Sequence, residues 1–278
     1  MAFLQNGGRR IYWERHGEPQ DPAILFMHGA GSNAATWWQQ LPAFQASGFT
    51  CLTMDIRCFG RSAAPLDEFT FEHMVADALA VLDAAEVKSA AVAGQSLGGM
   101  IALRMALQHP ERVRAFISCD SSLGVDHPGV LETIRSRQIT MQAASIEQRS
   151  LGPWFLANHP DKAALYAQIN HFNPSAHSVP AAEWGGALGR LMEPGQLLPM
   201  EALLGVTQPT LFVVGRQDPI VSPEVTREFA GRVPGSDVVV VEDSGHSAYF
   251  EQPGRFNAGV LGFLKARLLQ ELSTGVGG

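Results

Sequence analysis

The sequence carries little charge, and most of that charge is negative. Only 17% of its 278 residues are charged, and 27 acidic residues against 20 basic ones give a net charge of -7 and a pI near 5.7. It contains no block of like charges and no arginine-rich tail. Because nucleic-acid-binding domains usually present a basic stripe, we expect no nucleic-acid partner.

Long apolar runs and cysteine pairs are also missing. No uninterrupted apolar stretch approaches the ~20 residues that span a bilayer, and residues 1–18 lack the apolar segment of a secretory signal. The three cysteines, at positions 51, 58 and 119, form no CxxC pair, and their odd number favours free thiols in a reducing compartment. We therefore expect a cytoplasmic protein with no membrane partner.

What the sequence does contain is an alternation of strand-like and helix-like segments. Its short apolar runs end in glycine or a polar residue, as strands buried on both faces do. This alternation predicts a largely parallel sheet with helices on both faces. The short connection between residues 9–17 and 23–29 predicts that these two strands form an antiparallel edge. The predicted strands are 9–17, 23–29, 49–55, 89–95, 113–120, 210–218 and 236–243, and the predicted helices are 72–86, 98–110, 222–234 and 254–272.

The alternation stops between about residues 124 and 205. This stretch contains helix-like segments, aromatic residues and methionines but no strand-like apolar run. We interpret it as a helical cap inserted between two strands and packed over the sheet. The domain organisation that follows is a core of residues 1–123 and 206–272, a cap of residues 124–205 and a disordered tail at residues 273–278.

The segment GQSLG at residues 94–98 fits the pattern G-x-S-x-G, follows a predicted strand and opens a predicted helix. A sharp turn in this context exposes the hydroxyl of Ser96, and the glycines remove Cβ atoms that would collide where strand and helix meet. The alternative is a glycine-rich turn with a helix-capping serine. A phosphate-binding loop needs a following lysine and a dinucleotide site needs G-x-G-x-x-G, and GQSLGG has neither.

A serine hydroxyl needs a base before it can act as a nucleophile. Of the nine histidines, His246 follows a predicted buried strand by a short polar loop, at the same carboxyl edge of the sheet as Ser96. The base in turn needs an acidic partner. Asp218, just past the preceding strand, is the preferred candidate, and Asp120, at the end of an earlier strand, is its rival. The acidic residues at 242 and 243 are too close to His246 in sequence.

Further motifs occur in a fixed order along the chain. They are HGAGSN at 28–33, DIRCFGRS at 55–62, GQSLGG at 94–99, GRQDPIV at 215–221 and SGHSAYFEQP at 244–253. In this order they resemble the oxyanion loop, the D-x-R-G-x-G-x-S loop, the nucleophile elbow and the acid and base loops of the α/β-hydrolase superfamily. The resemblance covers nearly the whole chain.

The resemblance implies an α/β fold with a mostly parallel eight-stranded sheet, flanking helices and an inserted helical cap. It implies a catalytic triad of Ser96, His246 and Asp218, and an oxyanion hole made by the backbone N–H groups of Ala30 and Leu97. Backbone donors suit this task because they are rigid and already oriented.

Two residues of these motifs invite separate interpretations. His28 is expected to tie down the oxyanion loop rather than to take part in catalysis. Cys58 stands where the family usually has glycine. Since glycine there can adopt a positive φ that is costly for cysteine, we expect a negative φ and a simply packed Cys58.

The serine at the elbow argues against the aspartate-dependent epoxide hydrolases and haloalkane dehalogenases of the superfamily. We expect hydrolysis of a small, fairly apolar carboxylic ester or lactone through an acyl-enzyme, with no cofactor and no metal. The alternatives are a carbon–carbon bond hydrolase acting on a vinylogous diketone, a cofactor-free perhydrolase, and a non-catalytic ligand-binding protein. Relatives that cleave carbon–carbon bonds often have asparagine where this chain has Gln95, which favours esters.

A small-molecule substrate is thus the expected partner, and the sequence is equally compatible with a monomer and a homo-oligomer. The cap should roof the substrate pocket. The residues expected to line it, or to border it beside the acid loop, are Trp154, Phe155, Trp184, Met192 and Val221.

Overall fold

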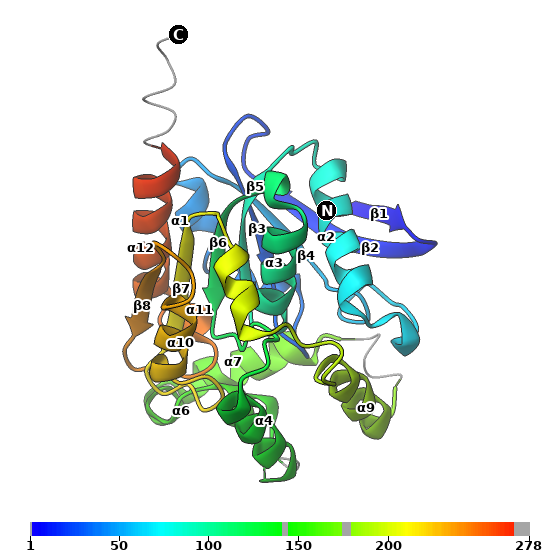
Figure 1. The fold of residues 1–278 in the computed structure, drawn as a ribbon, viewed down its shortest axis with the longest axis vertical. Coiled ribbons are helices and arrows are strands. Elements are labelled where there is room, and N and C mark those ends of the chain that lie inside the picture. Colours follow the sequence, from blue (N-terminus) through cyan, green and yellow to red (C-terminus); the bar gives the residue numbers. More distant parts are fainter. Residues whose placement is uncertain (1, 141–143, 174–178, 270–278) are drawn as a thin grey trace.

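An eight-stranded sheet forms the centre of the molecule (Figure 1). The computed structural model describes residues 2–140, 144–173 and 179–269. The strand order is β1-β2-β4-β3-β5-β6-β7-β8, and every pair from β4 to β8 is parallel. The strands are β1 (Ala2–Asn6), β2 (Arg9–His16), β3 (Ala23–Met27), β4 (Thr50–Met54), β5 (Ala90–Gln95), β6 (Val113–Cys119), β7 (Thr210–Gly215) and β8 (Asp237–Val241). The predicted α/β fold with a mostly parallel sheet is confirmed.

The antiparallel edge is present, but its strand pairing differs from the prediction. β2 pairs with β1 on one side and with β4 on the other, both antiparallel, whereas β3 lies between β4 and β5. The predicted pairing of residues 9–17 with 23–29 is therefore wrong. β1 was missed because its exposed and partly buried residues alternate at the edge of the sheet, which gives no continuous apolar run.

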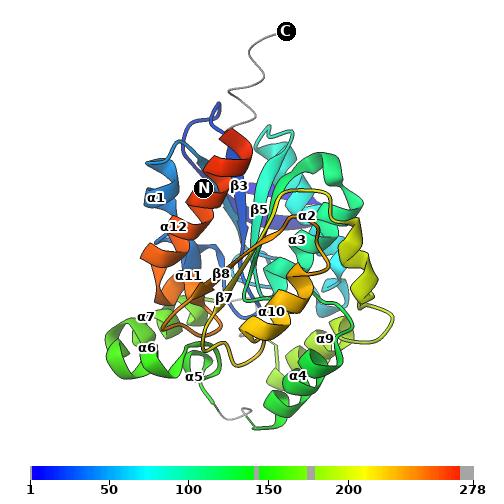
Figure 2. The same cartoon turned by 60° about the vertical axis from the view of Figure 1, so that its left-hand side comes forward.

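Helices cover both faces of the sheet, and each face has its own apolar core. Alternate residues of β3 show the division, since Leu25 and Met27 face one core while Ile24 and Phe26 face the other. The first core lies under α2 (Phe71–Ala84), α3 (Leu97–Gln108) and α10 (Pro223–Ala230); the second lies under α1 (Leu41–Gln45), α11 (Ala248–Glu251) and α12 (Pro253–Leu264) (Figure 2).

Helix α2 ends in a left-handed residue that is not glycine. Glu86, just past the helix, has φ of 55°, and its N–H donates to the carbonyl of Asp83 at 2.9 Å. The N–H of Val87 reaches back to the carbonyl of Leu82 at 2.8 Å. This pair of bonds closes the helix in the Schellman arrangement, whose left-handed position usually holds glycine.

The helical insert between β6 and β7 forms the cap and lies at the carboxyl ends of the parallel strands (Figure 1). Its helices divide between the two cores. Residues of α5, α6 and α7 pack into the second core, and residues of α4 and α9 pack into the first, so the two groups stand apart (Figure 2). The cap helices are α4 (Pro128–Thr140), α5 (Ile146–Ser150), α6 (Pro153–Asn158), α7 (Pro160–His171) and α9 (Ala181–Leu191).

The remaining expectations on chain organisation concern the termini and membranes. The tail predicted to be disordered, residues 273–278, lies outside the described residues. Within the described ranges, no helix is both long enough and apolar enough to cross a membrane.

Candidate active site

Ser96 occupies the turn between β5 and α3 in a strained backbone conformation. Its φ is 50° and its ψ is -110°, a region that residues other than glycine rarely adopt. The turn is fixed from both sides, because the N–H of Ser96 donates to the carbonyl of Cys119 at 3.0 Å and the hydroxyl of Ser121 donates to the carbonyl of Ser96 at 2.7 Å. Strain that is held in place like this is common at functional turns.

The glycines around Ser96 are required by close backbone contacts. A Cβ on Gly94 would lie 2.1 Å from the carbonyl oxygen of Gly98, and a Cβ on Gly98 would lie 2.2 Å from the carbonyl oxygen of Met27. The predicted reason for these glycines, the close approach of strand and helix, is therefore confirmed.

His246 is paired with Asp218. Its Nδ1 lies 2.9 Å from Oδ2 and 3.0 Å from Oδ1 of Asp218, and both side chains are almost entirely buried. Asp218 Oδ1 also accepts the N–H groups of Ile220 and Val221 at 2.8 and 3.1 Å, which fixes the carboxylate. Burial opposes a charge on the imidazole, but the charge and hydrogen bond of Asp218 outweigh it and raise the pKa of His246 above its ordinary value.

Asp120, the rival acid, makes different contacts. Its Oδ1 accepts the N–H of Gly215 at 2.8 Å and its Oδ2 accepts the N–H of Ala248 at 2.9 Å, so both oxygens are engaged by backbone. Burial, reinforced by the charge of Asp218, raises the pKa of Asp120 well above its ordinary value. Asp120 thus links the end of β7 to the start of α11, while Asp218 contacts the imidazole.

The loop that carries His246 is anchored by residues that sequence reasoning missed. Glu251 is buried and accepts three backbone N–H groups, those of Gly245, Ser247 and the cap residue Gly152, at 2.8, 3.2 and 2.8 Å. Burial raises the pKa of Glu251 to about 7, although the backbone donors lower it. The motif SGHSAYFEQP contains this residue, but its spacing does not indicate that the carboxylate accepts hydrogen bonds from the backbone of the same loop.

Two further bonds hold the same loop. The amide of Gln95 donates to the carbonyl of His246 at 2.7 Å, and the N–H of His246 donates to the carbonyl of the cap residue Ser150 at 2.7 Å. The residue before Ser96 and the end of α5 therefore both position the backbone of His246.

The loop at residues 28–33, predicted to form the oxyanion hole, is held by His28. The N–H of Ile56 donates to Nε2 of His28 at 2.9 Å, so Nδ1 carries the proton and donates to the carbonyl of Gly29 at 2.7 Å. Burial lowers the pKa of His28, which keeps the ring neutral. The loop is tied to the cap as well, because the amide of Asn173 donates to the carbonyl of Gly31 at 2.9 Å. These contacts match the structural role predicted for His28.

The backbone conformation of Cys58 differs from the prediction. Its φ is 71°, in the left-handed region, and not negative as expected. The side chain is buried in the first core, and burial raises the pKa of its thiol to about 12. The N–H of Cys58 donates to the carbonyl of Ser62 at 2.8 Å, so the loop keeps its tight turn with a strained cysteine where glycine would be unstrained.

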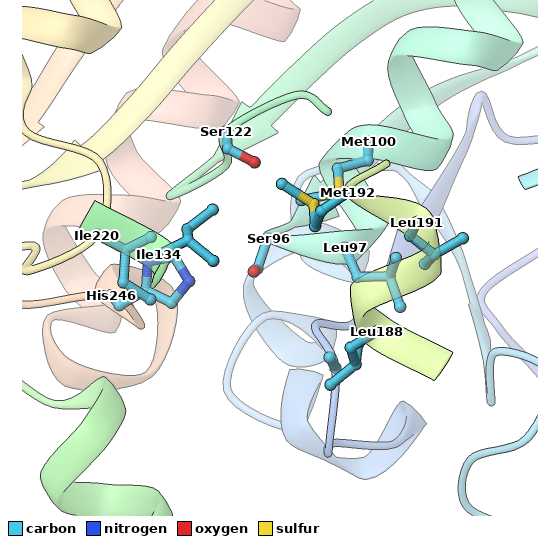
Figure 3. Close-up of a pocket in the computed structure, with 11 residues that line it drawn as sticks. Ser96, Leu97, Met100, Ser122, Ile134, Leu188, Leu191, Met192, Ile220 and His246 are labelled. Atoms are coloured by element: carbon cyan, nitrogen blue, oxygen red, sulfur yellow. The ribbon is translucent and has the colours of Figure 1, made fainter. Parts of the chain in front are cut away.

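Ser96 and His246 border one cavity of about 220 Å³ (Figure 3). Ala30 and Leu97, the predicted oxyanion residues, line it too. The rest of its wall is almost wholly apolar and includes Met100 and Ile220 from the core. The cap contributes Ile134, Leu188, Leu191 and Met192.

Of the five residues expected at the pocket, only Met192 is part of this wall. Phe155 is fully buried in the second core, and Trp184 stacks on Phe59 with ring centroids 4.8 Å apart. The N–H of Trp154 donates to the amide oxygen of Gln217 at 3.1 Å, on the acid loop. Val221 is buried, and its N–H donates to Asp218. The structure thus assigns these four to packing and to loop positions.

Ile134, Leu188 and Leu191 were missed as wall residues because aliphatic residues on a helix give the same pattern whether they face a cavity or a core. Ile220 was missed although it lies in the GRQDPIV loop, between β7 and α10. Within the described residues, no cluster of three or more His, Cys, Asp or Glu side chains is arranged to hold a metal ion.

Comparison with known proteins agrees with this architecture. Rhodomycin D methylesterase DnrP from Streptomyces peucetius is 29% identical over 272 residues, which cover 88% of this chain and 91% of that protein. 3-oxoadipate enol-lactonase 2 from Acinetobacter baylyi is 24% identical over 253 residues, 90% of this chain and 91% of that protein. The solved structure of Est816, described as an N-acyl homoserine lactone degrading enzyme, has a TM-score of 0.79 at 26% identity and covers 94% of this chain and 100% of its own.

Residues 22–253 match the family described as the alpha/beta hydrolase fold. The match spans the segments 28–33, 94–99, 215–221 and 244–253 that carry the predicted site residues, and the helical insert between β6 and β7. The chain belongs to the alpha/beta hydrolase fold family, and it is a hydrolase of that family.

Proposed function

We propose that this protein is a serine hydrolase that cleaves a small, fairly apolar carboxylic ester or lactone through an acyl-enzyme. One observation carries the proposal. Ser96, on its strained turn, borders the same apolar cavity as His246, whose Nδ1 is hydrogen-bonded to Asp218. A hydroxyl, an oriented imidazole and a buried carboxylate are the groups that acyl transfer requires.

The reaction proceeds in two stages. Nε2 of His246 takes the proton from the Ser96 hydroxyl as the oxygen attacks the substrate carbonyl carbon. The tetrahedral oxyanion accepts hydrogen bonds from the backbone N–H groups of Ala30 and Leu97. Its collapse breaks the bond to the alcohol oxygen, which receives the proton from His246; for a lactone the released alcohol remains attached to the acyl group.

A water molecule then completes the cycle. His246 takes a proton from the water as its oxygen attacks the acyl carbonyl, and returns that proton to Ser96 when the second tetrahedral intermediate collapses. Throughout, Asp218 accepts a hydrogen bond from Nδ1–H, which fixes the tautomer and stabilises the imidazolium.

Two observations support the proposed substrate class: the apolar lining of the cavity and the names of the similar proteins. Aliphatic and methionine side chains favour an apolar substrate of modest size, because the cavity measures about 220 Å³. The methylesterase and the lactone-degrading enzymes named above act, by their names, on ester or lactone bonds.

The test is covalent labelling of Ser96. Incubation of the folded protein with an organophosphonate or sulfonyl fluoride, followed by peptide mass spectrometry, should place the adduct on Ser96, and prior denaturation should abolish it. Ser96→Ala should lower kcat toward short-chain esters or lactones by about 10⁴–10⁶-fold while the protein stays folded. Absence of an adduct, or unchanged turnover by the variant, contradicts the assignment.

A substrate panel separates the ester proposal from carbon–carbon bond cleavage. If Ser96 is labelled but esters and lactones are not turned over while a vinylogous diketone is, the site performs carbon–carbon hydrolysis instead. Labelling without turnover of any of these compounds points to a ligand-binding role on the same fold.

A further inference from the structure

Ser122 carries a buried hydroxyl that has no hydrogen-bond partner in the described part of the chain. The residue is 3% exposed, and its Oγ has no partner among the described residues. The neighbouring Ser121 differs, because its hydroxyl donates to Ser96 and accepts the N–H of Leu123 at 3.0 Å. Buried hydroxyls are nearly always paired, so the exception calls for a reason.

Ser122 also lines the cavity beside Ser96 and His246. Figure 3 shows its hydroxyl turned toward the side of the cavity where Met100 and Met192 lie. Apart from Ser96 and His246, Ser122 is the only residue with a polar side chain on the described wall. An unpaired hydroxyl in such a wall provides a single point at which a ligand oxygen can be recognised.

We propose that the Ser122 hydroxyl binds an oxygen carried by the substrate, separate from the ester or lactone group that reacts at Ser96. The preferred substrate is then an apolar ester or lactone bearing one hydroxyl or keto oxygen, not a plain hydrocarbon chain. This inference rests on the proposed hydrolase function and makes Ser122 a specificity-determining residue.

The physical basis is the cost of leaving a polar group unpaired. When the oxygenated substrate binds, its oxygen and the Ser122 hydroxyl satisfy each other inside the cavity. When a plain substrate binds, the hydroxyl stays unpaired and loses any remaining access to water, which weakens binding. Discrimination of this kind should be expressed in kcat/KM for matched substrates.

The experiment uses pairs of esters with the same leaving group. In each pair the acyl chains differ by one oxygen, either a hydroxyl or a keto group, at the third, fourth or fifth carbon; one further pair carries the oxygen on the alcohol side. We expect the wild-type protein to favour the oxygenated member of at least one pair by ~10-fold or more in kcat/KM. Ser122→Ala should remove this preference by lowering kcat/KM for the oxygenated ester and raising kcat/KM for the plain ester, which then no longer buries an unpaired hydroxyl.

A matched control is Thr53→Val. Thr53, in β4, has a buried hydroxyl without a partner among the described residues, and it does not line the cavity. This variant should keep the wild-type preference. Thermal unfolding distinguishes a purely structural role for Ser122: because its hydroxyl makes no bond with any described residue, Ser122→Ala should not lower the melting temperature.

Three results overturn the inference: no preference for oxygen in any pair, an unchanged preference in Ser122→Ala, or a marked fall in the melting temperature of that variant. Failure of the proposed function looks different, since then Ser96 would not be labelled and the plain ester would not be hydrolysed either.

Discussion

At the residue scale, the two buried aspartates near His246 differ in what they contact. Asp218 faces the imidazole, and Asp120 faces two backbone N–H groups. Both are carboxylates at the ends of strands on the same edge of the sheet, so proximity alone does not separate their roles. Their hydrogen bonds do.

Asp218→Asn should therefore impair catalysis more than Asp120→Asn. Loss of the carboxylate lets the imidazole adopt the wrong tautomer, and kcat should fall by about 10⁴-fold. Since Asp218 raises the pKa of His246, the variant's acidic limb of kcat/KM should move to lower pH. Steady-state kinetics across pH 4–9 measure both effects. Asp120→Asn loses a backbone bond and should mainly lower stability; the reverse ranking in kcat would assign the acid to Asp120.

The sequence singled out Ser96, His246 and Asp218 because each follows a strand on one sheet edge. In the structure His246 contacts Asp218 and borders the same cavity as Ser96, and the catalytic roles of the three stay a prediction. Ser122 and Glu251 escaped prediction because their roles depend on which neighbours leave an atom unpaired or bring distant N–H groups together. The φ of Cys58 escaped it because the fixed shape of the loop outweighs the cost of a left-handed cysteine.

At the element scale, the Schellman end of α2 offers a stabilising change. Glu86 is exposed and has φ of 55°, a conformation that glycine adopts without strain. Glu86→Gly should raise the free energy of unfolding by about 0.5–1 kcal/mol, because the relief of strain exceeds the entropy that glycine adds to the unfolded chain. Chemical denaturation measures the change. Glu86→Ala, which removes the charge but keeps a Cβ, is the control and should give no such gain; equal gains would contradict the strain argument.

The strands and helices that the sequence predicted are those with a strong local pattern. The buried parallel strands are continuous apolar runs, and flanking helices such as α2 and α12 have one buried and one exposed side. The sequence did not predict the edge strand β1 or the pairing of β2. Both depend on which neighbouring strand offers backbone hydrogen-bond partners across the sheet. The cap was predicted because residues 124–205 lack strand-like runs. Its division between the two cores depends on side-chain packing, which no local sequence pattern encodes.

At the scale of the whole molecule, Glu251 joins the cap to the core through Gly152 and the His246 loop. Its folded pKa, about 7, is higher than the ordinary value of 4.5, so folding favours the protonated acid. The stability it contributes is therefore fully present below pH 4.5 and is lost as pH rises through 7.

Glu251→Gln removes this titration, and glutamine has only one oxygen with which to accept three N–H groups. We expect the variant to be less stable than wild type at pH 5, and the difference to shrink by pH 8. Denaturant unfolding at both pH values measures it. Stability curves that run parallel across this range would show that Glu251 does not titrate there.

The cavity draws its parts from two different regions of the chain. The groups proposed for bond cleavage lie in loops at the sheet edge. Of the cap residues on the wall, Ile134 belongs to α4, Leu188 and Leu191 belong to α9, and Met192 directly follows α9. Sequence change in these two helices can therefore alter what fits above Ser96 while leaving the reacting groups untouched. For evolution, and for anyone redesigning the protein, substrate range is a property that can drift on one segment while the catalytic step is inherited unchanged on another.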